Sequence, residues 1–199
     1  MAHHEQSTKA PLRFDPRERI IERARHDNIA ALPNTDEKLL RWYPYKNGWD
    51  MIHSVTEAKN RIKQRDRHLH MLSELGNIAV PKHTNFIGVD PVWEDEIVVY
   101  TFVDRIADLQ PVTKKADIQH IYGTLLKYFS WVHDTEEPAI IFDFFKLDQF
   151  SINPNGPEGS QEITMFDLDP YIDDNTPANQ ATAREGLRQI QIIGQATTV

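Results

Sequence analysis

The sequence predicts an α+β protein, on three observations. Apolar runs with strand character and segments of helical periodicity follow one another in the order small sheet, helix, hairpin, long helix, hairpin and short helix. No repeated strand–helix–strand pattern indicates a doubly wound parallel sheet, and no segment is repeated. The 199 residues, 40% of them hydrophobic, suffice for one sizeable core or for two small lobes that share a cleft. We expect a flexible tail over 1–16 and a single folded unit over 17–199.

The first half predicts a small sheet around one helix. Short apolar runs within 19–48, separated by polar links and the turn-prone PNTDE, indicate antiparallel strands. Segment 50–77 has apolar residues at approximately helical spacing and ends near Gly76, a natural C-cap. The runs NFIGV and EIVVYTFV, joined by the acidic turn DPVWED, then indicate a hairpin within 78–106.

The second half predicts a long helix, a hairpin and a short helix. Segment 113–134 starts at a candidate N-cap, Thr113, and carries one apolar face made of Ile118, Ile121, Leu125, Leu126, Phe129 and Val132. The strand-like runs FSI and EITMF flank the loop NPNGPEGSQ, whose glycine and proline content suits a surface connection. The segment NQATAREGLRQIQIIGQ predicts the last helix.

Composition excludes several classes of function. The formal charge of -8, with no basic run to offset it locally, argues against nucleic acid as a partner. The chain has no cysteine, which excludes disulfides and a thiol nucleophile and suits the cytoplasm. No apolar run approaches the roughly 18 residues of a membrane span, so we expect no membrane association. The motifs of zincins, serine hydrolases and P-loop NTPases are absent.

Two acidic segments late in the chain carry the candidate chemistry. FDFFKLDQFSI (142–152) and ITMFDLDPYI (163–172) follow the long helix and each place carboxylates beside an apolar strand. With the preceding elements, this order resembles the protein-kinase-like superfamily, which includes protein kinases and aminoglycoside and choline kinase-type phosphotransferases. The resemblance covers roughly 19–172. It implies a two-lobed protein-kinase-like fold, with a small antiparallel N-lobe sheet (about 17–104) and a truncated helical C-lobe (about 105–199).

The resemblance also implies residues that bind ATP and magnesium. Asp167 in FDLDP stands where the family has its metal-binding D-F-G aspartate, and Asp169 replaces the glycine. Arg41 in KLLRWYP takes the place of the third-strand lysine that reaches the phosphates. Its acidic partner would be Asp66 or Glu57 of the following helix, between which the sequence does not choose.

Two alignments of the catalytic loop stay open. In the first, Asp143 is the catalytic carboxylate and Asp148 is a metal ligand in place of the family's asparagine. The second, which we favour, aligns IIFDFFKLDQFSI with the family pattern IIHRDLKPENFLI. Lys146 then matches the lysine and Gln149 the asparagine, while Phe144 stands where the catalytic aspartate belongs.

The departures from the family favour a degenerate kinase. The segment ERARHDNIAAL has no glycine, although a phosphate-binding loop needs glycines to bring backbone N–H groups close to phosphate. With Arg41 and Phe144, this predicts a pseudokinase that binds a nucleotide or a protein. Two alternatives stay open: an active ATP- and magnesium-dependent phosphotransferase that uses Asp143 and Asp167 on a hydroxyl substrate, and a different acid-base enzyme with Asp143, Lys146 and Asp167 in its cleft.

Overall fold

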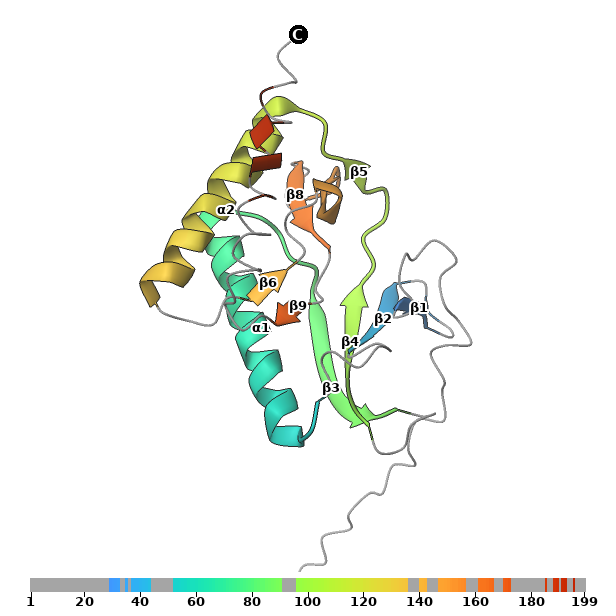
Figure 1. Ribbon diagram of the computed structural model, residues 1–199. Helices are drawn as coiled ribbons and strands as arrows, with labels where there is room; N and C mark the ends of the chain where they lie inside the picture. The colour runs from blue at the N-terminus through green and yellow to red at the C-terminus, as the bar shows by residue number, and fades with distance from the viewer. Residues whose placement is uncertain are drawn as a thin grey trace, which may run out of the picture.

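A computed structural model describes most of the central part of the chain (Figure 1). The described residues are 29–32, 35, 37–43, 52–90, 96–135, 140–142, 147–156, 161–166 and 170–172, with single residues between 185 and 195. They form three antiparallel sheets and two long helices, which confirms the α+β class. The tail expected over 1–16 lies outside the described residues. None of the described helices is long and apolar enough to cross a membrane.

The largest sheet has four strands in the order β1-β2-β4-β3. Its strands are β1 (Ile29–Ala31), β2 (Lys38–Tyr43), β3 (His83–Val89) and β4 (Ile97–Asp104), all antiparallel to their neighbours. Side chains alternate between the two faces, as a pleated strand requires. One face carries a small core of Ala30, Leu40, Trp42 and Val98. The predicted strands KLLRWYP, NFIGV and EIVVYTFV are confirmed, whereas the first part of the segment 19–48, up to residue 28, lies outside the described residues.

Helix α1 (Val55–Gly76) covers the other face of this sheet and has well-defined ends. At its start, the Ser54 hydroxyl accepts a hydrogen bond from Glu57 N at 3.1 Å, which satisfies one of the helix's exposed N–H groups. At its end, Asn77 adopts the left-handed conformation (φ 51°), and its N–H bonds to Ser73 O at 2.7 Å. The expectation that Gly76 is the cap is therefore wrong, because Asn77 takes that conformation.

Helix α2 (Lys115–Thr135) lies beside α1 in Figure 1, and the two helices share the main core. Ile118, Ile121, Leu125 and Val132 are buried there, as the periodicity predicts. Leu126 is 45% exposed, so its place on the inner face was wrong. One residue turns a helix by about 100°; Leu126 therefore points away from the face that Leu125 defines.

The remaining strands form two small sheets that hold the acidic segments. One sheet contains β5 (Gln110–Pro111), β7 (Phe150–Asn153) and β8 (Glu162–Met165), in the order β5-β7-β8. The other pairs β6 (Ile140–Phe142) with β9 (Pro170–Ile172). A 3-10 turn, η2 (Leu147–Gln149), leads into β7. The predicted runs FSI and EITMF are confirmed as β7 and β8, and the described residues of the last predicted helix are helical.

The connection between α1 and β3 joins the large sheet to β8. Ala79 forms a parallel bridge with Thr164, in which Ala79 N donates to Ile163 O at 2.8 Å and Met165 N donates to Ala79 O at 2.9 Å. Met165 is buried in the main core. The hairpin that precedes the FDLDP segment is therefore fixed to the same connection that positions α1 and β3.

Candidate functional site

The predicted site residues divide between described and undescribed parts of the chain. Asp143, Lys146 and Asp167 lie outside the described residues. Arg41, Asp66, Asp148 and Gln149 are described, and the structure places Asp66 apart from the other three.

Arg41 connects the large sheet to the end of the β7–β8 hairpin. Its side chain leaves β2 and is only 7% exposed, and its Nη1 donates to Phe166 O at 2.9 Å across 125 positions of sequence. A buried guanidinium must find hydrogen-bond acceptors, because its desolvation is costly otherwise. Phe166 directly precedes Asp167 in the sequence. The contact therefore fixes the backbone at the start of the FDLDP segment.

The backbone of Gln149 also bonds to Phe166. Phe166 N donates to Gln149 O at 3.3 Å. The Gln149 side chain points to Asp148, whose Oδ1 accepts from Nε2 at 3.4 Å, and Asp148 is exposed. Of the predicted residues, the structure thus brings Arg41 and Gln149 together through Phe166. It leaves Asp148 at the surface.

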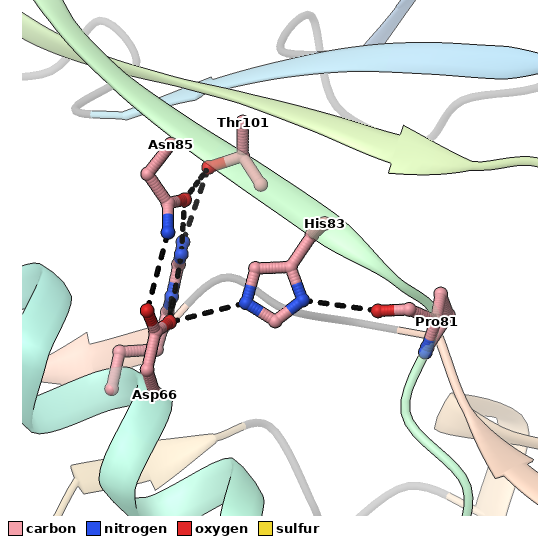
Figure 2. Close-up of polar contacts among 6 residues, drawn as sticks. Asp66, Pro81, His83, Asn85 and Thr101 are labelled. Carbon is pink, nitrogen blue, oxygen red and sulfur yellow. Dashed lines mark hydrogen bonds and ion pairs between the residues drawn. The ribbon is translucent and has the colours of Figure 1, made fainter.

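Asp66 lies in a different polar network, between α1 and the large sheet (Figure 2). Its Oδ1 accepts from Arg65 Nε at 3.2 Å and Nη2 at 3.1 Å, and lies 3.1 Å from His83 Nε2. Its Oδ2 accepts from Asn85 Nδ2 at 3.3 Å. The carboxylate thus bonds to neighbours on α1 and β3. Glu57, the alternative partner for Arg41, instead pairs with Arg61 one helical turn away.

Arg65 is the residue that sequence reasoning missed. It is only 4% exposed, and its Nη1 donates to Thr101 Oγ1 at 3.2 Å. Nη2 also donates to Asn85 Oδ1, which accepts from Thr101 Oγ1 as well. The signal was present, because Arg65 lies on the helical stripe that includes Leu69 and Leu72. A cation on the buried stripe of α1 indicates a polar contact inside the fold.

The groups around Asp66 determine the direction in which its pKa is shifted. Burial raises the pKa of Asp66, but the hydrogen bond from His83 and the positive charge of Arg65 outweigh burial and hold that pKa below its usual value. His83 Nδ1 lies 3.0 Å from Pro81 O, while Nε2 faces the Asp66 carboxylate.

Asp66 and His83 of this network also line an open pocket. Its volume is about 640 Å³, and Leu69, Val80 and Pro81 line its apolar part. Its rim carries both signs of charge, including an ion pair between Lys38 Nζ and Asp104 Oδ1 at 2.6 Å. Within the described part of the chain, no three histidine or carboxylate side chains gather as a metal site would need. The pocket therefore shows no bias toward an anion or a metal ion.

Comparison with models of protein families, with curated proteins and with solved structures found no match to this chain.

Proposed function

We propose that this chain is a divergent kinase-like module that acts by binding a nucleotide or a protein and does not transfer phosphate. The strand arrangement supports the kinase-like part. Strand β2 lies beside β4, α1 follows β2 and covers one face of their sheet, and the β6–β9 and β7–β8 pairs flank the two acidic segments. A phosphate-transfer site, or the remnant of one, requires those segments to be held close together.

The contact between Arg41 and Phe166 O is the observation that supports the proposed loss of phosphate transfer. In the family, the cation at this position reaches the phosphates and pairs with a carboxylate on the helix. Here the guanidinium is buried against Phe166 O, and α1 directs a second cation, Arg65, toward the sheet. The helix carboxylate Asp66 bonds to Arg65, His83 and Asn85. Through its bond to Phe166 O, Arg41 has a structural role among the described residues.

Of the two predicted magnesium ligands, Asp148 and Asp167, the structure describes only Asp148. The described candidate ligand, Asp148, is exposed and accepts a hydrogen bond from its neighbour Gln149, and the described part of the chain offers no cluster of ligands around it. Hard divalent cations need several oxygen ligands at once. Phosphate transfer with ATP and magnesium is therefore the outcome that would overturn the proposal.

The test measures ATP turnover and ligand-dependent unfolding on the same preparation. We expect ADP formation to be equal in the wild type, Asp143→Ala and Asp167→Asn, since contaminating activity alone is then measured. Turnover that both substitutions abolish would refute the proposal. Arg41→Lys is a useful control, because restoring the family's lysine should not create turnover if Arg41 has a structural role.

Thermal unfolding with ATP, with magnesium and with both identifies what the module binds. A ligand that binds the native state raises the midpoint by mass action. If ATP raises the unfolding midpoint of the wild type but not of Asp167→Asn, the ligand is a nucleotide. No rise at saturating ATP assigns the binding role to a protein partner.

A further inference from the structure

Strand β3 forms one edge of the four-stranded sheet. On one side, β3 pairs with β4 along its whole length, from His83↔Val103 to Val89↔Ile97, without a bulge. Within the described part of the chain, no further strand pairs with β3. An edge strand of this kind offers a row of backbone donors and acceptors to another strand.

The flanking hydrogen bonds reveal which backbone groups point outward. Asp104 N donates to Lys82 O and Asp90 N donates to Glu96 O, both at 2.9 Å. Because hydrogen-bonded pairs alternate along an antiparallel ladder, Thr84, Phe86 and Gly88 turn their N–H and C=O groups toward β4. The outward groups therefore belong to His83, Asn85, Ile87 and Val89. Among the described residues, only the Tyr100 hydroxyl bonds to one of them, at Val89 O, 3.2 Å away.

The sequence of the β3 edge lacks two features that normally prevent strand pairing. From Thr84 to Val89 it contains no charged residue and no proline. Phe86 is 53% exposed and Val89 is 57% exposed. In a chain with a formal charge of -8, two copies repel one another over most of their surface. The uncharged strip of β3 is where that repulsion is smallest.

We propose that β3 pairs antiparallel with β3 of a second copy of this chain, around a two-fold axis at Phe86. Phe86 is the middle residue of His83–Val89. A two-fold axis there places Asn85 opposite Ile87 of the second copy and His83 opposite Val89 of the second copy. Outward-pointing groups then meet outward-pointing groups along the whole strand, so the register agrees with the hydrogen-bond alternation.

The side chains favour the same register. Phe86 lies opposite its own copy in a non-hydrogen-bonded pair, the arrangement with the closer side chains. Each Phe86 ring already packs edge to face on Phe102, with ring centroids 5.2 Å apart and an interplanar angle of 90°. Pairing extends this contact into a cluster of aromatic rings from both copies, and aromatic cross-strand pairs stabilise sheets.

A cysteine pair tests the register directly, because the chain has no cysteine of its own. Non-hydrogen-bonded partners have Cα atoms about 4.5 Å apart, within the range of a disulfide. Phe86→Cys should therefore give a covalent dimer on a non-reducing gel after mild oxidation. Val89→Cys is the matched control: its two copies lie six residues out of register, roughly 20 Å apart, and should stay monomeric. Equal yields, or a higher yield from Val89→Cys, would overturn the register.

Sedimentation of the wild type tests the pairing itself. We expect the mass to rise from monomer to dimer with concentration, and Phe86→Lys to raise the dissociation constant by about tenfold or more, since like charges then face one another. Mixing Phe86→Lys with Phe86→Glu should restore the dimer. Leu126→Lys, at an exposed position of α2, is the control that should leave the mass unchanged. A monomer at every concentration, or a dimer that Phe86→Lys does not weaken, would overturn the proposal.

Discussion

Replacing Gly76 by alanine should destabilise the protein, because α1 and α2 approach too closely there for a side chain. An ideal Cβ on Gly76 would lie 2.0 Å from Thr124 Oγ1, 2.1 Å from Cγ2 and 2.6 Å from Cβ. Thr124 is buried, so it cannot turn into solvent. Overpacking of this kind costs about 1–3 kcal/mol, and the helical preference of alanine returns at most about 1 kcal/mol. We expect the free energy of unfolding, measured in urea, to fall by about 1–2 kcal/mol.

Gly123→Ala supplies the matched control within α2. A Cβ at that position meets nothing within 4 Å, so the substitution should stabilise the helix by roughly 0.5–1 kcal/mol. Thr124→Ala removes two of the three atoms nearest to the new Cβ, and the double variant with Gly76→Ala should therefore lose less stability than the sum of the single variants. If Gly76→Ala is as stable as Gly123→Ala, the two helices do not pack at this distance and the reasoning fails.

Two further predictions concern the charged and titrating groups of α1. Burial, and then the charge of Arg67, lowers the pKa of His68 from 6.5 to about 4. As the pH falls, His68 therefore binds a proton in the unfolded chain before it does so in the folded protein. Up to about 3 kcal/mol of the free energy of unfolding should be lost between pH 6.5 and 4. Urea unfolding across this range should show a flatter pH dependence for His68→Gln, and equal slopes would contradict the assignment. Asp66→Asn removes the carboxylate beside buried Arg65 and should cost about 2 kcal/mol or more. Asp104→Asn, which breaks the exposed pair with Lys38, should cost less than about 1 kcal/mol, and equal losses would show that Arg65 does not depend on Asp66.

Local periodicity was sufficient to predict the main elements. The alternating runs of β3 and β4 and the apolar stripe of α2 each follow from neighbours within a few residues, and the structure confirms them. The role of Gly76 could not be predicted in the same way. Its lack of a side chain serves a contact with Thr124 on another helix, and only the packing of α1 on α2 reveals that contact.

The candidate site shows the same division between local and distant information. The acidic segments were visible as a pattern, but Arg41 Nη1 donates to a backbone carbonyl, and such an acceptor has no sequence signature. The partner expected for it, Asp66, is bonded to Arg65 and His83, and the histidine comes from a strand beyond the end of the helix. A polar side chain on a helix can be recognised from the sequence, but its choice between nearby cations depends on how the helix packs.

The contacts of α1 bear on the proposed loss of phosphate transfer. Toward the sheet, α1 is fixed by the buried Arg65 and the Asp66–His83 contact. Toward α2, it is fixed by the close approach at Gly76 and by His68, whose Nδ1 lies 2.5 Å from the buried Tyr128 hydroxyl. These contacts involve groups that are costly to separate, because each would leave a buried polar atom or a gap behind. A helix held from both sides suits a rigid binding module better than an enzyme whose helix must move to complete its site.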